Sequence, residues 1–156
     1  MKAANYYASG EIDRATHLRN DDDWLAEQLA NPSSRFAPVW RMQNLFAKDD
    51  EQQPVFLHTG EATAATADEM VWLGFENGTA YFALDYSKQA EPPLDDIGVF
   101  RDLRAVGALL SHQAGTLLAY ARGIVYWHNR HRFCGECGAP TLSRHAGHLR
   151  VCNNPD

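Results

Sequence analysis

Cysteine spacing constrains this chain more than any other feature. Cys134 and Cys137 are separated by two residues in the stretch FCGECG, and Cys152 follows after fourteen more. A structural zinc site takes four ligands in a tetrahedron, usually from two short loops, or knuckles, that each supply two ligands. Gly135 and Gly138 suit a knuckle, because glycine allows the tight turn in which backbone N–H groups point at the sulfurs. The stretch therefore predicts one zinc knuckle.

The interval between Cys137 and Cys152 has the length of one strand out and one strand back, with a turn at Ala146-Gly147. Cys152 then begins a second knuckle, whose partner cysteine belongs about two to five residues later. The sequence ends four residues after Cys152, so we expect a zinc ribbon that lacks its fourth ligand. The predicted metal ligands are Cys134, Cys137 and Cys152.

Other interpretations of the thiols stay open. A thioredoxin-like redox pair needs a strand before the CxxC and a helix after it, and neither pattern surrounds Cys134. The three thiols could also be unrelated. A histidine, His145 or His148, could supply the fourth ligand, although the hairpin is expected to point both along the ribbon. Three ligands plus water would resemble a catalytic zinc, but no general base is suitably placed.

Charge is unevenly distributed along the 156 residues. Residues 1–121 hold 9 Lys and Arg against 18 Asp and Glu, whereas residues 122–156 hold 5 Arg against 2 acids. The basic tail is either a solvated face or a surface that meets phosphates. The odd number of cysteines fits a reducing compartment, and no apolar run approaches a membrane span. The start lacks the apolar region of a signal peptide, so we expect a soluble, cytoplasmic protein.

Residues 20–31 are predicted to form a short helix, with Asn20 as its N-cap and aspartates in its first turn. Its inward stripe consists of Trp24, Leu25 and Leu29. Strand-like pieces follow at 37–46 and 54–58.

Residues 70–86 carry the clearest local signal, a hairpin around Asn77-Gly78. This dipeptide suits a type I′ turn, in which both central residues have positive φ. Pairing outward from the turn predicts an apolar face made of three cross-strand pairs: Phe75 with Ala80, Leu73 with Phe82, and Val71 with Leu84.

From residue 100 the apolar spacing changes to that of helices, over 100–110 and 111–131, the second with Ser111 as N-cap. Its core-facing stripe consists of Leu117, Ala121, Ile124, Val125 and His128. Strands followed by helices predict an α+β fold with a mixed or antiparallel sheet and C-terminal helices. We expect a domain at 1–131, including a helical linker from about 100, and an incomplete ribbon at 132–156.

Four stretches of the chain resemble the NADH pyrophosphatase family of Nudix hydrolases. They are DRATHLR (13–19), FRDLRAV (100–106), WHNRHRFCGECGAPT (127–141) and GHLRVCNNPD (147–156). The resemblance implies a Nudix-like N-terminal domain joined through the zinc ribbon to a catalytic Nudix domain, and members commonly dimerise.

The activity that the resemblance implies is hydrolysis of the NAD(H) pyrophosphate to nicotinamide mononucleotide and AMP, with similar removal of NAD caps from RNA in some members. Glutamates of the Nudix box, G-x5-E-x7-R-E-x2-E-E-x-G, would hold Mg²⁺ or Mn²⁺ for attack by water. This sequence has no two adjacent glutamates. We therefore assign no catalytic residue to it, expect the catalytic domain to lie outside it, and expect the chain to be inert alone.

Substrate contacts are expected from arginines, whose guanidinium fork matches phosphate oxygens. Arg104 resembles the arginine that family members place near the dinucleotide, although it could equally be a surface residue paired with Asp102 or Asp96. Arg144, His148 and Arg150 on the ribbon could also face a nucleotide.

A different function also fits the sequence: a stand-alone zinc ribbon whose basic tail binds RNA or a protein. Tyr126 and Trp127 are expected to be buried, which removes a stacking platform from that alternative.

Overall fold

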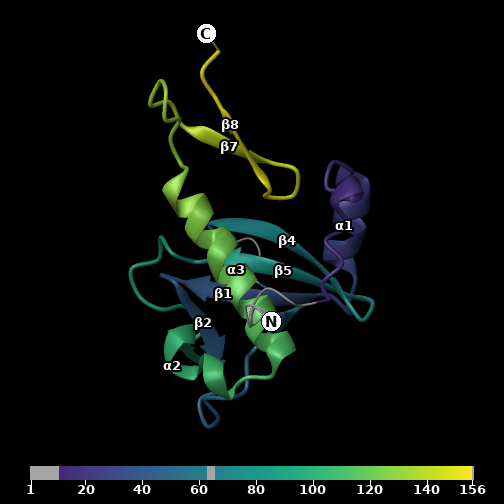
Figure 1. Cartoon of the computed structure of the whole chain (residues 1–156), viewed down its shortest axis with the longest axis vertical. Coiled ribbons are helices and arrows are strands. Elements are labelled where there is room, and N and C mark those ends of the chain that lie inside the picture. Colours follow the sequence, from purple (N-terminus) through teal and green to yellow (C-terminus); the bar gives the residue numbers. More distant parts are fainter. Residues whose placement is uncertain (1–10, 63–65, 156) are drawn as a thin grey trace, which may run out of the picture.

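The computed structural model describes residues 11–62 and 66–155, which form a mixed sheet with helices on both faces and a small hairpin beyond it (Figure 1). The strands of the main sheet are β1 (Arg35–Trp40), β2 (Gln43–Phe46), β3 (Leu57–His58), β4 (Glu69–Glu76), β5 (Thr79–Asp85) and β6 (Val99–Arg101). The helices are α1 (Asp22–Ala30), α2 (Leu103–Val106) and α3 (His112–Arg130), with 3-10 turns at Thr16–Leu18 and Gly107–Leu109. The separate hairpin comprises β7 (Thr141–Arg144) and β8 (Leu149–Cys152).

The sheet runs in the order β4-β5-β1-β2-β6, and β3 pairs with β1. Strands β1 and β5 are parallel, while the other pairs are antiparallel. A mixed sheet with helices confirms the predicted α+β class. Among the helices of the described segments, none combines the length and apolarity that a membrane crossing requires.

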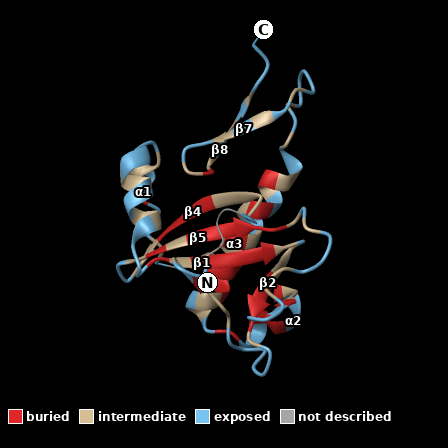
Figure 2. Ribbon diagram, turned by 180° about the vertical axis from the view of Figure 1, so that it is seen from behind, coloured by how far each residue is buried: buried red, intermediate tan, exposed pale blue. Residues whose placement is uncertain are grey.

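Helix α3 covers one face of the sheet, and its predicted stripe is confirmed. Leu117, Ala121 and Val125 are fully buried against β1, β4 and β5, and His128 is 3% exposed at the end of the stripe. Figure 2 shows this buried layer along the strands and the facing side of α3. Burial of one such leucine or valine stabilises the fold by about 1.5–3 kcal/mol. The N-cap is also as predicted, since the Ser111 hydroxyl accepts from the Ala114 N–H at 3.2 Å.

The opposite face of the sheet packs against α1 through a core of aromatic rings. Trp72, Phe36 and Phe82 are buried there, and Trp24 of α1 contacts Trp72 edge to face, with ring centroids 5.1 Å apart. The predicted inward side of α1 is therefore confirmed. Its N-cap is Asp21, whose carboxylate accepts from the Trp24 N–H at 2.9 Å. The prediction that Asn20 is the N-cap was wrong by one residue, because the Asp21 side chain is the one that reaches the Trp24 N–H.

The hairpin at Asn77-Gly78 forms, but its predicted register is only partly right. Both turn residues have positive φ, and Phe75 pairs with Ala80. The other two pairs were wrong, because Leu73 is an extra residue in a β-bulge. The observed pairs beyond it are Trp72 with Phe82, Val71 with Ala83, and Met70 with Leu84.

Gly74, next to the bulge, allows another segment of backbone to approach β4 closely. Its φ is +143°, and a Cβ there would lie 2.6 Å from the carbonyl oxygen of Asp13. The Asp13 backbone instead pairs with Phe75, by hydrogen bonds of 2.9 and 2.7 Å. A single added residue reverses which side chains face which side of a strand. Val71 and Leu73 therefore face α3, while Trp72 faces α1.

Three further expectations need correction. The strand-like piece at 37–46 is two strands, β1 and β2, joined by a turn at Arg41 and Met42, both of which have positive φ. The predicted helix at 100–110 begins only at Leu103, because residues 99–101 form β6 against β2. Tyr126 is 48% exposed instead of buried, since it lies on the side of α3 away from the sheet.

Candidate metal centre

The first predicted knuckle is formed between α3 and β7. The Cys134 N–H donates to the Ala139 carbonyl at 2.7 Å, and the Gly138 N–H donates to the Cys134 carbonyl at 2.9 Å. Gly138 has a φ of +73°, a conformation that favours glycine. These bonds close a tight loop with Cys134 and Cys137 on it, as the glycine spacing predicted.

The three sulfurs converge. The Sγ atoms of Cys134, Cys137 and Cys152 all lie within 4.8 Å of one another, and those of Cys137 and Cys152 are 3.4 Å apart. Tetrahedral zinc with Zn–S bonds of about 2.3 Å requires sulfurs about 3.8 Å apart. The 3.4 Å separation is slightly shorter than that value, and all three separations are at most 4.8 Å, so the donor set fits one zinc ion with small adjustments of the side chains.

Backbone dipoles favour a thiolate at this cluster. The pKa of Cys134 is lowered to about 7 by the backbone N–H groups of Cys137 and Glu136, and further by the neighbouring thiols. At Cys152 the Asn154 N–H lowers the pKa, but the hydrogen bond with Cys137, desolvation and the other thiol outweigh it and leave the pKa raised. Negative charge therefore collects first on Cys134, and a bound cation would favour deprotonation of its neighbours.

Cys152 has the environment of a second knuckle that begins there. The Asn154 N–H points at its sulfur, at 3.4 Å, as the N–H groups of a zinc knuckle do. Within residues 11–62 and 66–155, no other Cys, His, Asp or Glu joins the cluster. His148 instead donates its Nε2–H to the Trp72 carbonyl at 2.6 Å, so it is turned toward the sheet and away from the thiols.

The turn between β7 and β8 docks on β4, an edge strand of the main sheet. The Trp72 N–H donates to the Ala146 carbonyl at 3.0 Å, and the Trp72 carbonyl accepts from His148. Gly147, with a φ of +91°, lies so close that an added Cβ would be 2.7 Å from a methyl group of Val71. These contacts satisfy groups that an edge strand would otherwise leave open, and they fix the ribbon to the domain.

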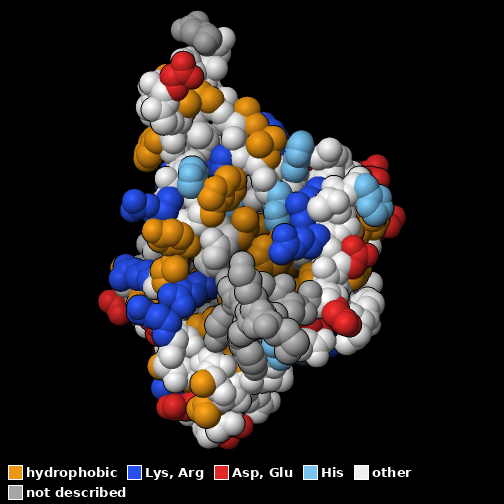
Figure 3. Space-filling view, viewed as in Figure 1, with side chains coloured by type: hydrophobic (Ala, Val, Ile, Leu, Met, Phe, Trp, Pro, Cys, Tyr) orange, Lys and Arg blue, Asp and Glu red, His pale blue; other side chains and the backbone are white. Residues whose placement is uncertain are grey.

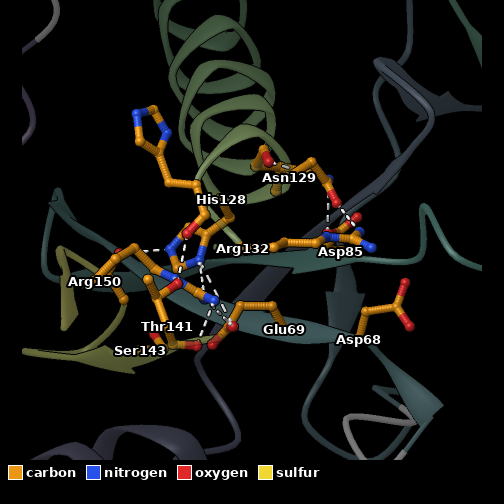
Figure 4. A network of polar contacts seen from close by, with 12 residues as sticks. Asp68, Glu69, Asp85, His128, Asn129, Arg132, Thr141, Ser143 and Arg150 are labelled. Carbon is orange, nitrogen blue, oxygen red and sulfur yellow. Dashed lines mark hydrogen bonds and ion pairs between the residues drawn. The ribbon is translucent and has the colours of Figure 1, made fainter. Parts of the chain in front are cut away.

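Polar side chains hold the other end of the hairpin against α3 (Figure 4). Arg150 projects from β8 and donates to Glu69 and to His128 Nδ1, both at 3.1 Å. It also donates to the hydroxyl and the carbonyl of Thr141, both at 3.0 Å. Next to this group, Asn129 donates to Asp85 at 2.9 Å and accepts from Arg132.

His128 is neutral in this network. Burial lowers its pKa, against the opposing effects of the Gly147 carbonyl and Glu69. Its Nδ1 accepts from Arg150, which requires the proton to be on Nε2, and Nε2 lies 2.6 Å from the Gly147 carbonyl. The 3.6 Å approach of Glu69 to Nδ1 is consequently not an ion pair, because a neutral imidazole carries no charge.

The arginines predicted to contact substrate lie in three different settings. The Arg104 side chain is 81% exposed, and its guanidinium donates hydrogen bonds through two of its nitrogens to the Asp102 carboxylate. These bonds lower the pKa of Asp102 to about 2. The sequence had left this ion pair with Asp102 open as the alternative to a contact with the dinucleotide. Arg144 is exposed at the end of β7. Arg150 is only 11% exposed and bonded within the protein. Contact of these three arginines with a substrate stays a prediction.

The sequence did not reveal the partners of Arg150. Glu69 comes from the distant strand β4 and Thr141 from the neighbouring strand β7, and neither has a local pattern that marks it. The one available signal was His128, a polar residue at the end of an otherwise apolar stripe, which indicates a buried polar partner.

Comparison with known proteins adds two family matches. Residues 33–127 match the NADH pyrophosphatase-like rudimentary NUDIX domain, and residues 129–156 match the NADH pyrophosphatase zinc ribbon domain. The chain belongs to the NADH pyrophosphatase family. The matches support the Nudix-like interpretation of the sheet and the zinc ribbon interpretation of the three thiols.

Several curated members of the NADH pyrophosphatase family align with the chain. The human NAD-capped RNA hydrolase NUDT12 is 24% identical over 200 aligned positions, covering 97% of this chain and 41% of that protein. The human mitochondrial NAD(P)H pyrophosphatase NUDT13 is 27% identical, covering 81% of this chain and 36% of its own length. The NAD-capped RNA hydrolase of Schizosaccharomyces pombe is 24% identical, and the alignment covers 97% of this chain and 50% of that protein. The chain spans about one third to one half of the length of these relatives.

Proposed function

We propose that this chain is the N-terminal region of an NAD(H) diphosphatase, in which the ribbon braces a Nudix-like domain against a catalytic one. The convergence of the three cysteine sulfurs directly after α3 carries this proposal. The printed names of the relatives, NAD(P)H pyrophosphatase and NAD-capped RNA hydrolase, indicate the reaction class.

The proposed reaction of the whole protein is hydrolysis of NAD(H) to nicotinamide mononucleotide and AMP, and of NAD-capped RNA at the same bond. Mg²⁺ or Mn²⁺ would be held by carboxylates outside these residues. In support, the metal-type cluster found within the described residues consists of thiolates, which suit zinc and not magnesium. This region would then be accessory, flanking the substrate, and inert by itself.

The proposed organisation has a domain at 1–131 and an incomplete ribbon at 132–156, with homodimers as the assembled form. Arg104, Arg144 and Arg150 remain the proposed substrate contacts. A cytoplasmic location is also proposed, supported by the odd number of free thiols, although one relative carries the word mitochondrial in its name.

A stand-alone binding module is the second candidate, and one observation favours it. Tyr126, expected to be buried, is 48% exposed. It lines a hollow of about 270 Å³ together with Arg104 and Arg122. An exposed ring beside arginines is an arrangement that binds single-stranded nucleic acid.

Activity measurements separate the two candidates. The 156-residue chain and the complete reading frame that contains it are each incubated with NADH and Mg²⁺ or Mn²⁺, and AMP is measured by chromatography. We expect AMP from the complete protein and none from the chain. AMP released by the chain would refute the accessory role, and no AMP from the complete protein would favour the binding module.

A further inference from the structure

Two arginines of the DRATHLR stretch meet on the α3 side of the molecule without an acidic partner. The Arg14 guanidinium lies 4.7 Å from the ring centroid of Tyr120. Burial raises the pKa of the same tyrosine, and the positive charges of Arg14 and Arg19 both act against that rise. Within the described residues neither arginine forms an ion pair. The Nε–H of Arg19 is shielded from solvent and has no hydrogen-bond partner in the part of the chain that the structure describes. Arg14 is exposed, whereas Arg19 is partly buried. A partly buried guanidinium is normally hydrogen-bonded, so the Nε–H of Arg19 is available to donate to a ligand.

Among the described residues, the surroundings of the pair add an imidazole ring and no negative charge. The His148 ring lies 6.3 Å from the Tyr120 ring, and its pKa is lowered by burial and by the charges of Arg19 and Arg14. No carboxylate is among the groups that act on His148 or on Tyr120. Asp13 precedes Arg14, but its carboxylate is bonded to the Ala15 N–H at 2.9 Å.

The backbone holds this arrangement in place. The Arg14 carbonyl accepts from the Trp72 indole N–H at 2.9 Å, and the neighbouring Asp13 pairs with Phe75. His148 is fixed by the carbonyl of Trp72. Segments from the N-terminal side, β4, α3 and the ribbon turn therefore converge around Tyr120. Figure 3 shows Lys, Arg and His side chains gathered on this face beside apolar ones.

We propose that Arg14 and Arg19 bind a phosphate group, with Tyr120 and His148 forming the sides of the site. A guanidinium fork matches two phosphate oxygens, and two forks around one phosphate neutralise its charge. The site is separate from Arg104, Arg144 and Arg150, and it does not depend on the proposed hydrolase activity. The phosphate can belong to a free nucleotide or to the backbone of single-stranded RNA.

Nuclear magnetic resonance of the 156-residue chain tests the site with three probes: AMP, adenosine and a ten-nucleotide oligouridylate. We expect AMP and the oligonucleotide to shift the His148 ring signals, and adenosine to leave them unchanged. If the oligonucleotide binds no more tightly than AMP, the ligand is a free nucleotide. Tighter binding of the oligonucleotide than of AMP favours an RNA backbone. In that case the slope of the logarithm of its binding constant against the logarithm of the salt concentration should fall by about one unit for each arginine removed.

Variants assign the binding to the two arginines. Arg14→Gln and Arg19→Gln should each weaken phosphate binding about tenfold, whereas Arg14→Lys and Arg19→Lys should retain part of it. Arg41→Gln is the matched control, because Arg41 also lies over an aromatic ring, at 4.9 Å from the centroid of Trp40. Equal losses in all three glutamine variants would overturn the proposal. Unchanged His148 signals in the wild-type chain would overturn it without any variant, even if a glutamine variant failed to fold.

Discussion

His128 near the end of α3 bonds the Gly147 carbonyl in the ribbon turn, with Nε2 and the oxygen 2.6 Å apart. This contact joins two features that are nineteen residues apart in the sequence, the core stripe of the helix and the turn of the hairpin. On its other side His128 accepts from Arg150 of the same hairpin. The ribbon is consequently held at its turn and at β8 by one neutral imidazole, which fixes its orientation relative to the sheet.

Gly147→Ala should loosen the ribbon. The added methyl group would lie 2.7 Å from Val71 in a backbone conformation that alanine resists, so we expect a loss of about 2 kcal/mol in the free energy of unfolding. Urea titration followed by tryptophan fluorescence measures it. Gly123→Ala is the matched control, since nothing lies within 4 Å of that site on α3, and it should stabilise by up to about 1 kcal/mol. Similar effects in the two variants would contradict the docking.

Arg150 should matter for stability and Arg144 should not. Arg150→Gln removes a largely buried charge from Glu69, His128 and Thr141, and we expect a loss of about 2–4 kcal/mol. Arg144→Gln, on the facing strand but exposed, should change the free energy of unfolding by less than about 0.5 kcal/mol. If Arg150→Gln were as stable as the wild type, its network would be dispensable and a substrate role would become the better explanation.

Acid should weaken the ribbon contacts through His148. Its pKa is below the ordinary value of 6.5 because it is buried and lies near Arg19 and Arg14. The unfolded chain then binds a proton that the folded chain does not, so stability is complete above about pH 6.5 and falls as the pH drops below it. Unfolding titrations between pH 5 and 8 should show a smaller slope in His148→Gln. The exposed neighbour variant His145→Gln should keep the wild-type slope, and an equal slope in both variants would argue against this cause.

Local chemistry made much of the fold predictable. Asn77-Gly78 specified its turn, Ser111 capped α3, and the glycines after Cys134 and Cys137 specified the knuckle, because each depends on residues a few positions away. Long-range contacts were not predictable in this way. Next to the bulge at Leu73, the Asp13 backbone occupies the space beside Gly74. A glycine inside a strand indicates a bulge or a close approach, but it does not indicate which distant segment approaches.

In the candidate site, too, the locally determined part was predictable and the long-range contacts were not. Thiolate spacing indicated which three residues converge, since zinc restricts the ligand type and geometry. The pairing of Arg150 with Glu69 spans 81 residues, and a sequence of isolated charges does not indicate which acid meets which base. The turn at Arg41 and Met42 was missed for a simpler reason, because neither residue is typical of positive φ.

The central claim is that Cys134, Cys137 and Cys152 hold one zinc ion, and native mass spectrometry of the freshly reduced chain with added zinc tests it most directly. We expect one zinc per chain, with that zinc lost from Cys137→Ser and from Cys152→Ser but retained in His145→Gln. A wild-type chain that takes up no zinc, or serine variants that retain it as the wild type does, would contradict the claim.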